Sequence, residues 1–252
     1  MRSERKSSQN LRRMVMTAMF MVLTYVTMLL LRIKVPPFLT LDVKDTIIIM
    51  CGLYLGPLSA LVVAVMVPAL EFFVSDTGFY GLIMNTLGSV TFSVTVALFY
   101  KWKKTIFGAV VGLITGALLM TGVMLVANVL ITPHYLVLMM HMEMGMAKEM
   151  VHSLLAPTLL PFNLLKGFLN VGCVLLLYKP LSRALHKIGA LIPTGKVAKA
   201  STNNEENSPR LGTKSRFSLT SIIVTATAVV LIAATLLLIF LVLGGKFTFG
   251  QV

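Results

Sequence analysis

Residues 159–179, LLPFNLLKGFLNVGCVLLLYK, are almost entirely apolar, yet their first half contains Asn163 and Lys166. An apolar run of about 20 residues is what an α-helix needs to cross the hydrocarbon core of a bilayer. A charged side chain at the centre of such a helix costs roughly 2.5–3.5 kcal/mol, so it normally faces a bundle interior or a polar cavity. The stretch therefore predicts a membrane helix that carries a polar site.

The rest of the chain has the same character, since 57% of its 252 residues are hydrophobic and only 12% are charged. These values lie far from those of soluble domains. The run 46–74 contains Gly56-Pro57, which predicts two shorter helices that meet at a tight turn. Further apolar runs lie at 14–31, 81–100, 105–131 and 218–243. We therefore expect an all-α integral membrane protein, a six-helix bundle plus one extra C-terminal transmembrane helix.

Three segments follow from this pattern. Residues 1–185 are expected to form a six-helix membrane domain. Residues 186–217 are polar, basic and rich in Ser, Asn, Gly and Pro, which predicts a cytoplasmic linker. Residues 218–252 are expected to add a transmembrane helix and a short external tail.

The net charge of +13 has a topological explanation. With the N-terminus in the cytoplasm, most lysines and arginines fall in cytoplasmic segments, as the positive-inside rule requires. This pattern predicts a multi-pass cell-membrane protein, a partner of the lipid bilayer and not of nucleic acid. Asp42 and Asp45 are expected in external loops. Residues 32–45 and 132–157 are expected to be external segments. The second would be a long loop for a connection between packed helices, and both are therefore candidate lids.

Polar residues at membrane depth define the candidate site. Asn163, Lys166 and Asn170 share one helix face. Snorkelling of Lys166 to the interface is the alternative. Asn128 is expected near the outer end of its helix, followed by Tyr135, and Asn85 near the start of its own. Each asparagine alone could be a cap or an interhelical hydrogen bond, but together these groups predict a pocket for a polar, flat or hydroxylated molecule.

Several short motifs support a resemblance over roughly residues 12–185. In chain order they are FLTLDVKD, GLYLGPLSALVV, GFYGLIMNTLGSVTF, ANVLITPHY and, most specific, LPFNLLKG at 160–167. Their order resembles the substrate-binding S component of energy-coupling factor (ECF) vitamin transporters, in its riboflavin-binding branch. The first helix departs from the family's Ala-x-x-x-Ala docking pattern, because it reads Ala18 to Val22 with valine in the last place.

The resemblance implies a function and a set of contacts. The six-helix domain of residues 1–185 would be the substrate-binding domain. It would bind riboflavin, as transported ligand and not as cofactor, on the external side of a prokaryotic plasma membrane. It would deliver the vitamin with a transmembrane coupling subunit and two ATPase subunits. The residues implied to contact the ligand are Asn128, Asn163 and Lys166, with Phe38, Leu39, Thr40 and Leu41 of the first external loop packing on it.

Other functions stay open at this stage. The same scaffold could bind another vitamin or a nucleobase-like ligand, or the chain could be a self-powered secondary carrier. A carrier needs a coupling-ion site at depth, and the only deep acid, Glu71, is expected near the outer surface. No phosphate-binding loop of the G-x-x-x-x-G-K-[ST] type is present, so ATP hydrolysis would come from partners.

Three local patterns complete the sequence-based predictions. The run MMHMEMGM at 139–146 could hold copper or fill a lid. Gly108, Gly112 and Gly116 form a stripe for helix packing or partner docking. No catalytic constellation recurs at one depth, so we expect no enzyme, no metal site and no resident cofactor.

Overall fold

The computed structural model describes residues 2–35, 39–75, 77–187, 226, 229–230, 232–233 and 248–249. Its helices are α1 (Arg2–Leu30), α2 (Lys44–Leu55), α3 (Pro57–Glu71), α4 (Gly78–Trp102), α5 (Ile106–Met140), α6 (Met144–Leu154), a π-helical turn η1 (Leu155–Leu159) and α7 (Leu160–Lys187). Its strands are β1 (Ile33–Val35), β2 (Leu39–Leu41) and β3 (Thr248–Phe249).

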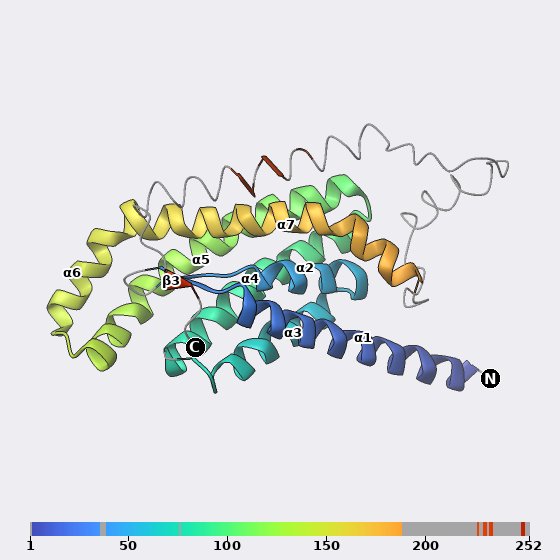
Figure 1. Cartoon of the computed structure of the whole chain (residues 1–252), viewed down its shortest axis with the longest axis horizontal. Coiled ribbons are helices and arrows are strands. Elements are labelled where there is room, and N and C mark those ends of the chain that lie inside the picture. The colour runs from blue at the N-terminus through green and yellow to red at the C-terminus, as the bar shows by residue number, and fades with distance from the viewer. Residues whose placement is uncertain are drawn as a thin grey trace.

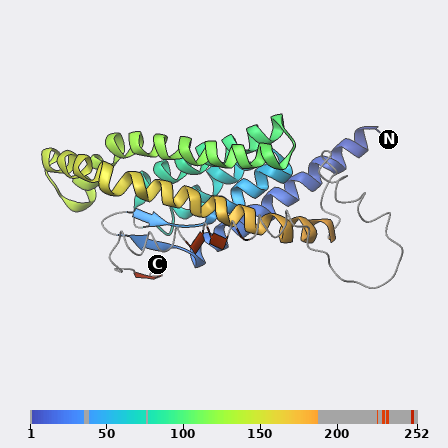
Figure 2. The same cartoon turned by 90° about the horizontal axis from the view of Figure 1, so that it is seen from above.

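The long helices lie roughly along one axis and form an elongated bundle (Figure 1). Viewed from above, α5 and α7 extend along the length of the molecule (Figure 2). The short sheet has the strand order β2-β1-β3, with β1 antiparallel to both neighbours. The β1-β2 hairpin lies toward the end of the bundle that carries α6, and α1 begins at the opposite end (Figure 1).

Four helical segments of the described chain are long and apolar enough to cross a membrane, namely Gln9–Leu30, Gly78–Trp102, Ile106–Met140 and Met144–Tyr178. Helix α3 is apolar but shorter. The predicted apolar runs before residue 186 are all helical, which confirms that part of the prediction. The chain is thus a mostly helical, multi-pass membrane protein, while the count of six helices plus one remains a prediction.

The predicted break at Gly56-Pro57 is confirmed. Gly56 has φ 94°, a left-handed conformation that glycine adopts without a Cβ penalty. Pro57 then opens α3, where its missing N–H costs nothing. The break lets α2 and α3 fold against each other, and both also pack against α4.

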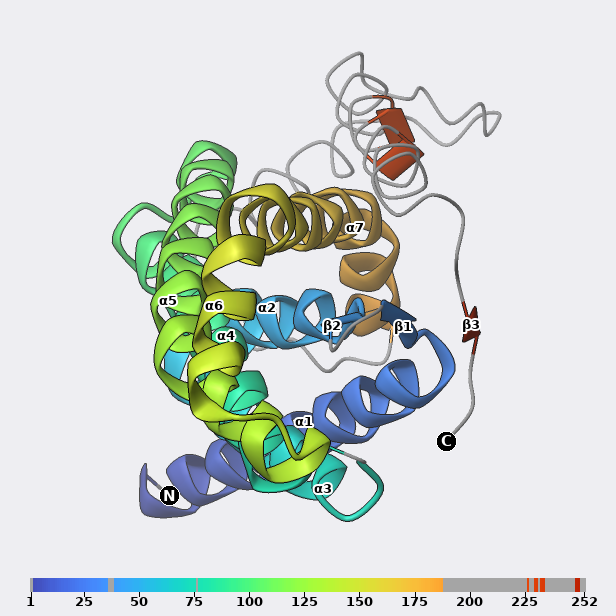
Figure 3. The same ribbon diagram turned by 90° about the vertical axis from the view of Figure 1, so that its left-hand side faces the viewer.

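The prediction of a loop over residues 132–157 is wrong. Helix α5 continues through Pro133 to Met140, and after a short connection α6 and η1 lead directly into α7. A proline removes only one helical hydrogen bond, and the surrounding helix retains its packing, so α5 passes through Pro133 without ending. Seen end on, α6 crosses the end of the bundle from α5 toward α7 (Figure 3).

The C-terminal predictions lie almost wholly outside the described residues. This applies to the linker predicted at 186–217, apart from the end of α7, and to the extra helix predicted at 218–243, apart from a few isolated positions. Thr248 of β3 pairs with Lys34 of β1, and Phe249 pairs with Ile33.

Candidate ligand-binding site

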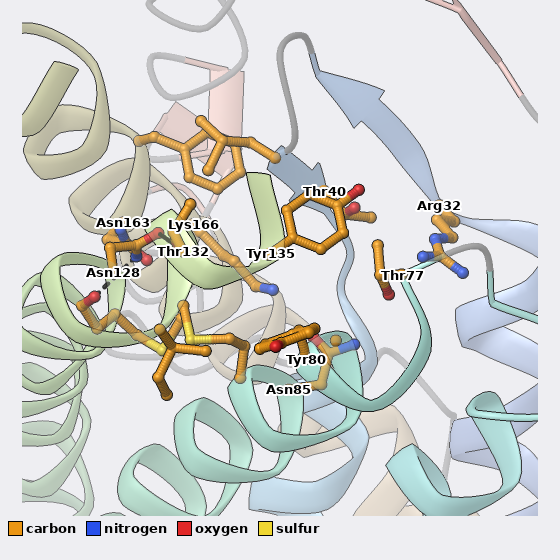
Figure 4. A pocket seen from close by; sticks show the side chains of 16 residues that line it. Arg32, Thr40, Thr77, Tyr80, Asn85, Asn128, Thr132, Tyr135, Asn163 and Lys166 are labelled. Carbon is orange, nitrogen blue, oxygen red and sulfur yellow. Dashed lines mark hydrogen bonds between the residues drawn. The ribbon is translucent and has the colours of Figure 1, made fainter. Parts of the chain in front are cut away.

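A cavity lies beneath the β1-β2 hairpin, between α4, α5 and α7 (Figure 4). It has about 720 Å³ of space not occupied by protein atoms, a figure that includes open solvent at its mouth. The residues that line it are Arg32, Leu39, Thr40, Thr77, Tyr80, Gly81, Met84, Asn85, Met124, Asn128, Ile131, Thr132, Tyr135, Phe162, Asn163 and Lys166.

Most of the predicted site residues meet at this cavity. Those that line it are Leu39, Thr40, Asn85, Asn128, Tyr135, Asn163 and Lys166. Leu41 does not line it, and its side chain packs in a core that includes residues of α5, α6 and α7. Phe38 lies outside the described residues.

Two helical asparagines form one polar end of the cavity. Asn128 donates from Nδ2 to the Met124 carbonyl at 2.7 Å, and its Oδ1 accepts from the Thr132 hydroxyl at 2.9 Å. Asn163 donates to the Leu159 carbonyl at 2.8 Å, the last residue of the π-turn. These bonds fix the orientation of both amides, so a ligand meets preoriented polar groups.

Aromatic rings supply an apolar wall. Tyr80 of α4 and Tyr135 of α5 approach edge to face, with ring centroids 6.2 Å apart. Both line the cavity, as does Phe162 of α7. Tyr135 is available here because α5 extends beyond Pro133.

Lys166 is held in an ion pair and does not snorkel as a free cation. Its Nζ donates to Asp42 Oδ2 at 3.0 Å, across 124 residues of sequence. Asp42 was expected in an external loop, but its side chain is 3% exposed. Burial alone would raise the pKa of its carboxyl, but the charges of Lys166, Lys44 and Arg32 outweigh burial and hold that pKa below its ordinary value of 3.8.

Asn170, on the same face of α7, does not line the cavity and anchors α2 instead. Its Oδ1 accepts from the Thr46 N–H at 2.9 Å and from the Thr46 hydroxyl at 2.7 Å. Its Nδ2 donates to the Asp42 and Lys166 carbonyls. This residue therefore joins the start of α2 to α7.

Asn85 belongs to a second polar cluster. It was expected near the start of a helix, where capping was one interpretation, but α4 begins at Gly78. Its Nδ2 donates to Glu71 Oε2 at 3.0 Å. The same carboxylate accepts from Lys44 Nζ at 2.9 Å, and its other oxygen lies 3.4 Å from Arg32 Nη1. Asn85 and Arg32, both lining the cavity, are thus linked to a buried carboxylate.

Arg32, Tyr80 and the buried ions behind the cavity were not among the site residues predicted from the sequence. Lys44 and Asp45 were expected in an external loop, yet they open α2 and are 1% and 3% exposed. Their alternation with hydrophobic residues in LTLDVKD was the available signal. Burial follows because each charge finds an opposite charge or a hydroxyl donor, such as Ser89 for Asp45.

No group of three or more His, Cys, Asp or Glu side chains arranged to hold a metal occurs in the described part of the chain. The site thus combines neutral amides, hydroxyls and aromatic rings with cations already paired to carboxylates. Such an arrangement can bind a polar, flat molecule by hydrogen bonds and stacking contacts. A helical membrane bundle around such a cavity defines a membrane-embedded binding protein.

Comparisons with known proteins identify the family. The family described as ECF transporter, substrate-specific component, matches residues 12–178, and the chain belongs to it. The riboflavin transporter RibU of Staphylococcus aureus (strain TCH60) is 27% identical over 153 residues, covering 61% of this chain and 80% of that protein. A solved structure titled "Structure and mechanism of the S component of a bacterial ECF transporter" has a TM-score of 0.56 and 26% identity, covering 70% of this chain and 98% of that one.

Family membership settles the class of protein that the sequence predicted. The chain is a substrate-binding component of a transporter and not an enzyme. The resemblance recognised in the sequence is thereby confirmed.

Proposed function

We propose that this chain captures riboflavin on the external side of a prokaryotic plasma membrane and delivers it with the ATP-driven module of an ECF importer. The observation that carries the proposal is the convergence of Asn128, Asn163, Lys166 and Tyr135 on one cavity beneath the hairpin. The similarity to a riboflavin transporter supports the same ligand.

The cavity chemistry suits the proposed ligand. Riboflavin joins a flat ring system with carbonyls to a hydroxylated chain and has no net charge. The tyrosine pair offers contacts to a ring. The amides and the Lys166 ammonium offer hydrogen bonds to carbonyls and hydroxyls, while the ion pair with Asp42 compensates the lysine charge.

Buried polar atoms add support for a polar ligand. Among the described residues, Arg32 Nε is buried and has no hydrogen-bond partner. An unpaired buried donor costs roughly 1–3 kcal/mol. Since Arg32 lines the cavity, a ligand carbonyl or hydroxyl could accept from it.

The proposed topology places the N-terminus in the cytoplasm and the cavity toward the outside. The coupling subunit would contact α1, which leaves Ala18 exposed and Val22 64% exposed. In this orientation the linker and tail predicted from the sequence would be cytoplasmic and external, respectively.

A binding titration tests the ligand. Purified protein without ATP should quench riboflavin fluorescence with a nanomolar Kd, which corresponds to about −12 kcal/mol. Asn163→Leu should weaken binding, because it replaces a fixed amide at the cavity wall by an apolar group. Unchanged fluorescence at micromolar wild-type protein would remove the flavin assignment and favour another vitamin or a nucleobase-like ligand.

A further inference from the structure

A chain of alternating charges runs behind the polar wall of the cavity. Lys166 pairs with Asp42, which lies 3.8 Å from Lys44, and Lys44 pairs in turn with Glu71. Glu71 contacts both Arg32 and Asn85. We call this row of side chains the charge chain. Its ends, Lys166 and Arg32 with Asn85, line the cavity, whereas its middle members, Asp42, Lys44 and Glu71, do not.

The middle of the charge chain is buried away from solvent. The side chains of Asp42, Lys44 and Glu71 are 3%, 1% and 3% exposed, while that of Lys166 is 13% exposed. Three bridges at 2.9 to 3.4 Å and one at 3.8 Å connect these side chains and Arg32. In such an environment an ion pair fixes the position of a long flexible side chain.

Resting on the proposed riboflavin function, we propose that Asp42 is a positioning residue that fixes and neutralises the Lys166 ammonium at the cavity wall. Asp42 does not line the cavity, so it acts on the ligand through Lys166. The hydrogen bond to Asp42 uses one of the three N–H groups of the Lys166 ammonium and leaves the other two for ligand acceptors.

The position of Asp42 also couples the external hairpin to α7. It follows β2 directly and precedes α2, and its backbone carbonyl accepts from Asn170 Nδ2 at 3.3 Å. The backbone bond is independent of the carboxylate charge. Asp42→Asn therefore removes the charge while retaining the side-chain size and this second connection.

The test is a double-mutant cycle with Asp42→Asn, Lys166→Met and the combined variant, read as riboflavin Kd by fluorescence quenching. Lys166→Met should weaken binding about ten- to hundredfold by removing a charge-assisted hydrogen bond. Asp42→Asn should weaken binding about tenfold in the wild-type background, because it removes the charge-assisted hydrogen bond that holds the Lys166 ammonium in place. In the Lys166→Met background it should change Kd less than about twofold, because the residue it positions is gone.

Ser89→Ala is the matched control. Ser89 donates to the neighbouring carboxylate of Asp45 and does not line the cavity. Its removal should leave riboflavin Kd unchanged. Thermal unfolding of every variant in detergent reports folding separately from binding.

The outcomes separate the two proposals. If the wild-type protein does not bind riboflavin, the proposed function fails and the role of Asp42 fails with it. If the wild type binds and Lys166→Met binds equally well, or if Asp42→Asn is equally harmful in both backgrounds, the positioning role is overturned while the function stands. Should Asp42→Asn alone not fold, Lys166→Met and the double variant decide: equal Kd values support positioning, and weaker binding by the double variant overturns it.

Discussion

The side chain of Lys166 shows how a charge is accommodated in an apolar helix. In an isolated α7 this lysine would lie in hydrocarbon, and replacing it by Met would be expected to leave folding intact. In the folded chain its ammonium compensates a buried carboxylate. Removing it therefore affects Asp42 as well, and the double variant is the cleaner test of ligand contact.

Lys44 gives a residue-scale prediction about stability. It lies between Asp42 and Glu71 with 1% of its side chain exposed. Lys44→Met should cost about 3–5 kcal/mol, because it leaves buried carboxylates without their shared cation. Thermal unfolding in detergent measures the loss. The exposed Lys148, changed to Met as the control, should alter stability by less than about 0.5 kcal/mol. Equal melting temperatures for the two variants would contradict this account of the charge chain.

Among the elements, α4 and α5 depend on small residues for their close contact. Gly112 and Gly116 of α5 face Phe92, Val96 and Phe99 of α4. The glycine stripe noted in the sequence thus serves packing within the bundle, so docking of a partner there is not needed to explain these two positions.

A pair of alanine substitutions on α5 tests this packing. A Cβ at Gly112 would lie 2.9 Å from the Phe99 Cβ and 3.2 Å from the Val96 carbonyl oxygen, whereas one at Gly122 meets nothing within 4 Å. Gly112→Ala should destabilise the bundle by about 1–3 kcal/mol through overpacking. Gly122→Ala should be neutral or stabilising by up to about 1 kcal/mol, since alanine favours the helix. The prediction fails if thermal unfolding ranks the two variants the other way.

For the whole molecule, the central expectation concerns energy. The sequence contains no phosphate-binding loop that could bind ATP. The chain belongs to a family of substrate-specific components of transporters. In proteoliposomes the chain alone should bind riboflavin without accumulating it. Co-reconstitution with a coupling subunit and an ATPase pair should give uptake that requires ATP. Uphill uptake by the chain alone under a proton or sodium gradient would support a secondary carrier instead.

The sequence by itself determined the membrane class, the helical runs, the break at Gly56-Pro57 and the family. These depend on local properties: apolar length, the conformational freedom of glycine, and short motifs. Asn163 and Lys166 were recognisable because they interrupt an apolar run. The assignment of residues 132–157 to a loop failed because Leu136, Ala147 and Val151 pack in a core with residues of β2 and α7, and local sequence patterns do not show such distant contacts.

Only the tertiary structure decided which polar groups meet. The bond between Lys166 and Asp42 joins residues 124 positions apart, and Asn170 reaches Thr46 over the same separation. Periodicity places a side chain on a helix face but does not say which charge lies opposite it. That depends on how α7, the hairpin and α2 pack, and the cost of burying unpaired charge selects the arrangement in which each carboxylate meets a cation or a hydroxyl.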